Sequence, residues 1–147
     1  MGGEMTLKTI LLVEDNPSDI DLTKRAFIKA QIMNELVVAE DGQQALDFLF
    51  NADQLKYGGE LPTLVLLDIN LPKLDGFDVL KAIRGDKHTH NLPVVFLSSS
   101  TEERDIKQAY DLGANSYIRK PVDFYQFSAV IQSLGQYWLS INETPSE

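Results

Sequence analysis

Five side chains suited to metal or phosphoryl chemistry each stand at the end of a short apolar run. They are Glu14, Asp15, Asp68, Ser98 and Lys120. Short aliphatic runs that alternate with helical patterns are typical of buried parallel strands. The carboxyl ends of such strands share the edge of the sheet where ligands bind. The sequence therefore predicts that three carboxylates, a hydroxyl and an ammonium converge on one crevice.

This set of groups suits magnesium-assisted phosphoryl chemistry. Clustered carboxylates repel one another unless a proton or a cation neutralises them. Oxygen ligands without His or Cys favour Mg²⁺, and Asp15 and Asp68 are natural ligands for it. Lys120 and Ser98 supply the cation and the hydrogen-bond donor that a phosphoryl anion needs. One carboxylate of the cluster is then available as a nucleophile.

Strand and helix patterns alternate along the chain in five βα units. Strands are expected at 9–13, 35–39, 64–67, 94–97 and 116–119. Helices are expected at 17–31, through 45–49, at 77–84, from a cap at Ser100 or Thr101 to Gly113, and from Val122 or Asp123 to Ile141. This alternation implies an α/β fold, a three-layer sandwich with right-handed crossovers.

Length and composition narrow the class of protein. The 147 residues suit one domain, expected at 8–141, with a flexible segment at 1–7 and a polar tail at 142–147. A net charge of −9 disfavours direct nucleic-acid binding. The chain has no cysteine, no apolar stretch of membrane-spanning length and no signal peptide, so we expect a cytoplasmic protein.

The chain resembles a response-regulator receiver domain of two-component signalling over nearly all of its length. The matching features are Glu14-Asp15, Asp68-Ile69-Asn70, the Leu-Pro-Lys-Leu-Asp-Gly turn at 71–76, Ser98, Tyr117 and Lys120-Pro121. Asp68 precedes Ser98 by 30 residues and Ser98 precedes Lys120 by 22, spacings that the family shares. The resemblance implies a flavodoxin-like fold with five parallel strands in the order 2-1-3-4-5 and about five helices.

The resemblance also implies a role for each residue of the site. Asp68 would accept a phosphoryl group from a histidine kinase, and Lys120 would pair with the phosphoryl oxygens. Mg²⁺ would be bound by Asp15, Asp68 and the backbone carbonyl of Asn70, with Glu14 acting through water. Ser98 would move to the phosphoryl group and Tyr117 would turn inward, which repacks the face made by the fourth helix, fifth strand and last helix. Asn70 and Ser100 hold positions that tune hydrolysis of the acyl phosphate in this family.

Two further features resemble the small single-domain regulators that partner phytochromes. The loop at 51–62 is extended, and only one helix and a tail follow Lys120-Pro121. The resemblance implies two partners, a sensor histidine kinase such as a phytochrome and a downstream protein that the sequence does not identify. Members of that group often dimerise, and Tyr125, Tyr137 and Trp138 of the last helix can supply such a surface.

Rival functions remain open at the level of sequence. A Mg²⁺-dependent phosphohydrolase with an aspartyl nucleophile would carry a second Asp at the position of Asn70, which cannot transfer protons. A flavodoxin-like cofactor binder would carry a phosphate loop where Glu14-Asp15 stands. A degenerate receiver acting as a scaffold would lack some of the acceptor-site residues. The favoured interpretation is a phosphoacceptor module, not an enzyme with turnover on a separate substrate, although it catalyses its own phosphoryl transfer and dephosphorylation.

Overall fold

The computed structural model describes residues 9–50, 61–120 and 123–141. Within these ranges the chain forms five parallel strands in the order β2-β1-β3-β4-β5. They are β1 (Ile10–Val13), β2 (Leu36–Ala39), β3 (Leu64–Leu67), β4 (Val94–Ser98) and β5 (Ser116–Arg119). The predicted flavodoxin-like sheet and its strand order are confirmed.

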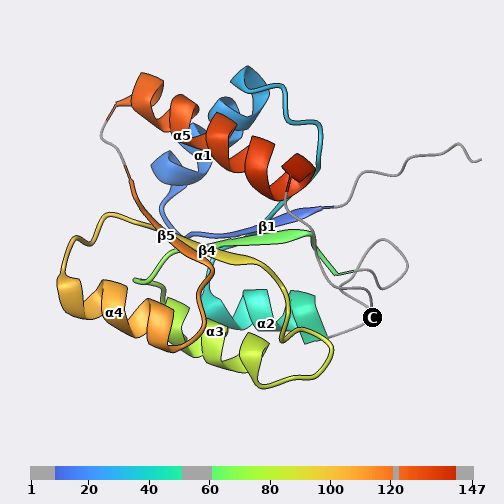
Figure 1. Ribbon diagram of the computed structural model, residues 1–147, viewed down its shortest axis with the longest axis vertical. Coiled ribbons are helices and arrows are strands. Elements are labelled where there is room, and N and C mark those ends of the chain that lie inside the picture. Colours follow the sequence, from blue (N-terminus) through green and yellow to red (C-terminus); the bar gives the residue numbers. More distant parts are fainter. Residues whose placement is uncertain (1–8, 51–60, 121–122, 142–147) are drawn as a thin grey trace, which may run out of the picture.

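Helices cover both faces of this sheet. They are α1 (Pro17–Lys29), α2 (Gly42–Phe50), α3 (Gly76–Arg84), α4 (Glu103–Asp111) and α5 (Phe124–Gln136), and a π-helical turn, Tyr137–Ile141, continues α5. In Figure 1, α1 and α5 lie on one face, and α2, α3 and α4 lie on the other. The molecule is therefore the predicted three-layer sandwich.

The central strand β3 packs into a hydrophobic core on each face of the sheet. Val65 and Leu67 pack into the core beneath α2 and α3, whereas Leu64 and Leu66 pack into the core beneath α1 and α5. All four side chains are fully buried. A central strand buried on both sides has no polar face, which accounts for its continuous apolar run. Its carboxyl end thereby fixes the residues that follow it.

Polar side chains cap the amino ends of most of the helices, as expected. The Asn16 side chain accepts a hydrogen bond from the Asp19 N–H and Pro17 opens α1, while Asp75 and Asp123 cap α3 and α5 in the same way. The prediction that Ser100 or Thr101 caps α4 is wrong. The N-cap of α4 is Glu102, which makes no side-chain capping bond. The Ser100 hydroxyl instead donates to the Asp105 carboxylate in the first turn of α4 at 2.6 Å.

The last helix passes through Gly135 without a break. A Cβ at this position would lie 2.6 Å from the Ile32 Cδ1 atom, so glycine allows α5 to approach the segment after α1 closely. The predicted segments at 1–7 and 142–147, and most of the predicted long loop at 51–62, lie outside the described residues. Among the residues the structure describes, no helix is long and apolar enough to span a membrane.

Candidate functional site

Three carboxylates meet at the carboxyl edge of the sheet. Glu14 and Asp15 follow β1, and Asp68 follows β3, the strand beside it. Carboxylate oxygens of the three residues lie within 4.8 Å of one another. Glu14 is buried, Asp15 is exposed, and 12% of the Asp68 side chain is exposed. The cluster therefore extends from solvent into the protein.

Backbone contacts hold Asp68 in place. Its N–H donates to the Val13 carbonyl at 3.1 Å, and one of its carboxylate oxygens accepts the Ile69 N–H at 2.9 Å. The first residue of α3, Gly76, donates its N–H to the Ile69 carbonyl at 2.8 Å. A Cβ at Gly76 would lie 2.2 Å from the Asp68 carbonyl oxygen. Only glycine allows α3 to begin so close to the residue that carries the carboxylate.

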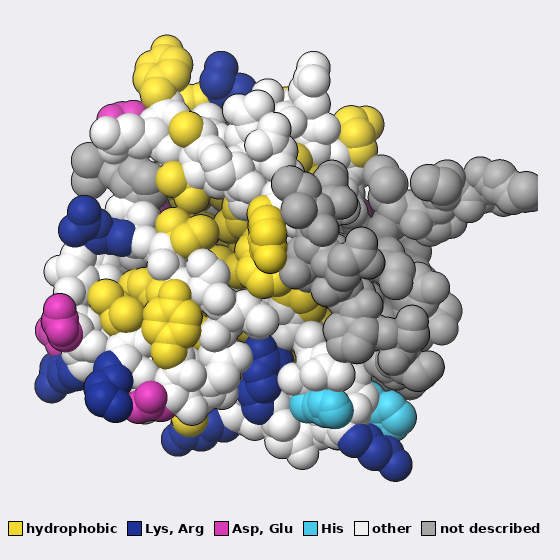
Figure 2. Space-filling view, viewed as in Figure 1, with side chains coloured by type: hydrophobic (Ala, Val, Ile, Leu, Met, Phe, Trp, Pro, Cys, Tyr) yellow, Lys and Arg dark blue, Asp and Glu magenta, His cyan; other side chains and the backbone are white. Residues whose placement is uncertain are grey.

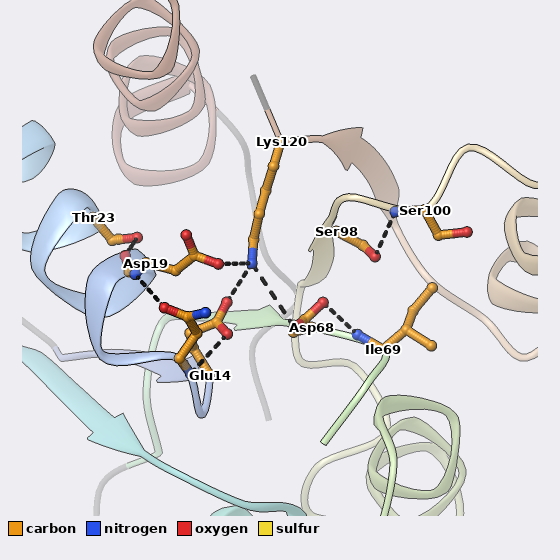
Figure 3. Close-up of polar contacts among 9 residues, drawn as sticks. Glu14, Asp19, Thr23, Asp68, Ile69, Ser98, Ser100 and Lys120 are labelled. Atoms are coloured by element: carbon orange, nitrogen blue, oxygen red, sulfur yellow. Dashed lines mark hydrogen bonds and ion pairs between the residues drawn. The ribbon is translucent and has the colours of Figure 1, made fainter. Parts of the chain in front are cut away.

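Lys120 supplies the positive charge of the site and lies at the end of the edge strand β5. It follows β5, and its N–H donates to the Ser98 carbonyl at 2.8 Å. Figure 3 shows its ammonium between Asp19 and Glu14 on one side and Asp68 on the other. The distances from Lys120 Nζ are 2.5 Å to Glu14 Oε1, 2.9 Å to Asp19 Oδ2 and 3.8 Å to Asp68 Oδ2. In this structure the ammonium therefore donates hydrogen bonds to Glu14 and Asp19, whereas its contact with Asp68 is a longer ion pair.

Asp19 is a member of the site that sequence reasoning missed. It lies in the first turn of α1, and the structure brings it to Lys120 across 101 residues of sequence. A usable signal was present, because a helix that starts at Pro17 directly after Glu14-Asp15 must place its first turn beside the carboxyl end of β1.

Burial and charge act in opposite directions on the acidic groups. Burial raises the pKa of Glu14 and the pKa of Asp68, because desolvation disfavours a charged carboxylate, while Lys120 opposes both shifts. The charge of Asp15 adds to the raised pKa of Asp68. Burial by itself would lower the pKa of Lys120, but its bonds to Glu14 and Asp19 raise it. Lys120 is therefore charged at neutral pH.

Ser98 and Tyr117 lie on neighbouring strands and are linked through Ser100. Ser98 is fully buried at the end of β4, and its Oγ accepts the Ser100 N–H at 3.2 Å. The Tyr117 hydroxyl donates to the Ser100 carbonyl at 2.9 Å. The Tyr117 ring, half-buried in β5, packs against Phe96 with 6.0 Å between ring centroids. Ser100 therefore connects the two residues with the two polar groups of its own backbone.

Asn70 stands at the open side of the pocket. It is exposed and follows Asp68 by two residues, at the start of the β3–α3 connection. That connection is anchored on the β2–α2 turn, where Lys73 Nζ lies 3.4 Å from the buried Asp41 carboxylate.

Comparison with known proteins assigns this arrangement to a family. The sequence pattern described as the response regulator receiver domain matches residues 10–132. The chain belongs to the response regulator receiver family. Similar proteins include the probable methanogenesis regulatory protein FilR2 of Methanothrix harundinacea, 39% identical over 138 residues, which are 92% of this chain and 86% of FilR2. Response regulator Rcp1 of Synechocystis is 34% identical over 139 residues, which are 95% of this chain and 94% of Rcp1.

Solved structures agree with this assignment. The receiver matches the crystal structure of the phosphorylated cyanobacterial phytochrome response regulator RcpA with a TM-score of 0.87 and 38% identity, over 96% of this chain and 100% of that one. It matches the Mn²⁺-bound form of Rcp1 with a TM-score of 0.81 and 35% identity, over 95% and 99% of the two chains. The relatives that match over most of their length are thus regulators of two-component type.

The receiver's acidic cluster has the donors that a divalent cation needs. All three members offer carboxylate oxygen, the ligand type that hard cations prefer. The desolvation that raises the pKa values of Glu14 and Asp68 is relieved by a bound positive charge. The residues present therefore fit a divalent metal ion.

A broad apolar surface lies on the α4–β5–α5 face of the receiver. Figure 2 shows hydrophobic side chains gathered on the face where β5 is flanked by α4 and α5. A groove of about 710 Å³ lies there between β5 and α5, and its apolar lining includes Ile118, Ala129, Val130, Leu134, Tyr137 and Trp138. Tyr125, the other aromatic residue expected on a dimer surface, lies elsewhere, with its ring 6.0 Å from Lys29 Nζ of α1.

Proposed function

We propose that this receiver accepts a phosphoryl group from a sensor histidine kinase on Asp68, with Mg²⁺ bound beside it. A single observation carries the proposal. The Asp68 carboxylate lies among two other carboxylates within 4.8 Å and has the Lys120 ammonium 3.8 Å away. Groups of both signs around one nucleophilic oxygen are what phosphoryl transfer requires, because this chemistry depends on positioning and on neutralisation of charge.

The transfer step uses Asp68 as the nucleophile. A carboxylate oxygen of Asp68 attacks the phosphorus of a phosphohistidine, and a P–O bond forms as the P–N bond breaks. The electron pair of the P–N bond returns to the imidazole ring of the kinase. Lys120 pairs with the phosphoryl oxygens and Ser98 donates a hydrogen bond to them. Later attack by water returns Asp68 and phosphate, so dephosphorylation by the receiver itself is part of the proposal.

Four residues are assigned to Mg²⁺. Asp15, Asp68 and the backbone carbonyl of Asn70 would bind the ion directly, and Glu14 would bind through water. When bound, Mg²⁺ neutralises the carboxylates and the incoming phosphoryl oxygens. The exposure of Asp15 and Asn70 supports their assignment as direct ligands, because Mg²⁺ keeps several water ligands and needs a side open to solvent.

Phosphorylation is proposed to act on the α4–β5–α5 face through Ser98 and Tyr117. Movement of Ser98 toward the phosphoryl group gives up its bond from Ser100, whose carbonyl holds the Tyr117 hydroxyl. Tyr117 then turns inward and the face repacks between two arrangements. The output is contact with a downstream protein or a second copy of the chain. The location is proposed to be the cytoplasm.

A phytochrome is proposed as the kind of kinase that supplies the phosphoryl group. RcpA is described as a cyanobacterial phytochrome response regulator, and it covers nearly the whole chain with a TM-score of 0.87. A phosphohydrolase is not favoured, because Asn70 cannot serve as the acid or base that its mechanism needs. A scaffold is disfavoured because each acceptor-site position carries a suitable residue.

Acetyl phosphate tests the acceptor directly. Purified protein with Mg²⁺ and acetyl phosphate should gain the mass of one phosphoryl group, and EDTA should prevent the gain. Asp68→Asn should gain none, whereas the control Asp47→Asn, which removes an exposed carboxylate of α2, should label like the wild type. Failure of the wild type to label while it binds Mg²⁺ would refute the acceptor role.

A further inference from the structure

Asp19 contacts the Lys120 ammonium but lies outside the carboxylate cluster. Its Oδ2 is 2.9 Å from Lys120 Nζ, closer than the 3.8 Å that separates this nitrogen from Asp68. The metal-competent cluster in the described residues contains Glu14, Asp15 and Asp68 and leaves Asp19 out. Asp19 therefore has a contact with the cation without a place among the proposed metal ligands.

The local fold aims the Asp19 side chain at Lys120. The Asp19 N–H donates to the Asn16 side chain at 3.1 Å, and its carbonyl accepts the Thr23 hydroxyl at 2.7 Å. Both bonds use the backbone of Asp19, so they fix the first turn of α1 and leave the carboxylate free for the ammonium. Figure 3 shows this carboxylate directed at Lys120 from the side opposite Asp68.

We propose that Asp19 is a positioning residue that holds Lys120 on the α1 side of the pocket until a phosphoryl group draws it away. This inference rests on the proposed function of Asp68. The phosphoryl oxygens on Asp68 compete with Asp19 for the position of the ammonium, because Lys120 Nζ is 2.9 Å from Asp19 but 3.8 Å from Asp68 and moves toward one by leaving the other. Asp19 thereby lowers the affinity of the site for a phosphoryl group and makes activation more reversible.

The size of the effect follows from the exposure of the pair. The Asp19 side chain is 36% exposed, so water screens its attraction for Lys120. An ion pair of this kind contributes modestly, and its loss should tighten binding of a phosphoryl mimic about two- to five-fold. Asp19→Asn keeps both backbone bonds and the shape of the side chain, so the fold should be retained.

Beryllofluoride, a mimic of the phosphoryl group on aspartate, measures the competition. Its apparent Kd at saturating Mg²⁺ is obtained by fluorine NMR for the wild type, Asp19→Asn and Asp21→Asn. Asp21 is the matched control, because it is an exposed acid of the same helix that pairs with Arg25 rather than Lys120. We expect tighter binding for Asp19→Asn and an unchanged Kd for Asp21→Asn.

A double-mutant cycle separates positioning of Lys120 from a general effect of charge. In a Lys120→Gln background, Asp19→Asn should leave beryllofluoride binding and the rate of acetyl phosphate labelling unchanged. An equal gain in both backgrounds, or no gain or a loss in the wild-type background, would overturn the proposal. Absence of any beryllofluoride or phosphoryl binding by the wild type would instead refute the function of Asp68, so the two failures are distinguishable.

Discussion

At the scale of single residues, the acceptor carboxyl of Asp68 lies in a place that disfavours its charged form. Burial, with the charge of Asp15, raises the pKa of Asp68. Between its unfolded and folded pKa values the native state binds more protons at this group than the unfolded chain does. Its contribution to stability is therefore favourable at low pH and is lost as the pH rises through that window. A bound divalent cation relieves the same repulsion.

Asp68→Asn should consequently stabilise the metal-free protein at pH 7. We expect the free energy of unfolding to increase by about 1 kcal/mol, because the amide cannot ionise. The gain should shrink as the pH falls toward the ordinary pKa of an aspartate, where the wild-type carboxyl is protonated too. Urea unfolding in EDTA at several pH values measures it. A gain that is equal at all pH values, or one shared by Asp47→Asn, would contradict this explanation.

Gly76→Ala tests the close approach of α3 to the acceptor. The new Cβ would lie 2.2 Å from the Asp68 carbonyl oxygen, so the helix or the acceptor must shift. We expect a loss of about 1–3 kcal/mol in the free energy of unfolding and slower labelling by acetyl phosphate. Gly85→Ala is the control, because its nearest atom would be 3.2 Å away. Equal effects of the two substitutions would show that the contact at Asp68 is not special.

At the scale of elements, Arg84 fastens α3 to the sheet edge opposite the site. Its guanidinium donates to the carbonyls of Gly113, His90 and Leu92 and to the Asn115 side chain, at 2.8–3.0 Å. Asn115 also accepts the Val94 N–H at 2.8 Å. One side chain of α3 thus ties the connections that lead into β4 and β5, the two strands that carry Ser98 and Tyr117.

Arg84→Lys should destabilise the protein, because an ammonium cannot reach this set of separated acceptors. The expected loss in the free energy of unfolding is about 2 kcal/mol, the size found when hydrogen bonds to a charged group are removed. Arg104→Lys, in an exposed pair with Glu102, should change it by less than about 0.5 kcal/mol. Thermal or urea unfolding distinguishes the two, and similar values would contradict the fastening role.

The sequence predicted a site residue best where that residue directly follows a strand. β3 and β5 lie where the apolar runs predict them, and Asp68 and Lys120 follow from their ends. The start of α1 at Pro17 places Asp19 near the carboxyl end of β1, but its partner Lys120 lies 101 residues away in the sequence, so the pattern around Asp19 does not indicate the contact itself. The link through Ser100 was missed for a different reason. It uses backbone N–H and carbonyl groups, which are the same in every residue type of that loop except proline.

At the scale of the whole molecule, the residues proposed to respond to phosphorylation lie on successive strands of the sheet. β3 carries Asp68, its neighbour β4 carries Ser98, and the edge strand β5 carries Tyr117 and leads to Lys120. The path from Asp68 to Ser98, and from Ser98 to Tyr117, therefore passes each time from one strand to its hydrogen-bonded neighbour. The path ends at the groove between β5 and α5, so the sheet itself connects the phosphoryl site with an apolar surface.

That surface predicts self-association of the phosphorylated form. With Mg²⁺ and beryllofluoride, sedimentation velocity should show a dimer. Tyr137→Glu should weaken the dimer at least about ten-fold, because it puts a charge at the rim of the groove, whose exposed aromatic is a typical anchor. Tyr125→Glu, on the same helix but turned toward α1, should leave the dimer intact. A monomer at about 100 µM with the mimic bound, or equal effects of both substitutions, would contradict dimerisation through this groove.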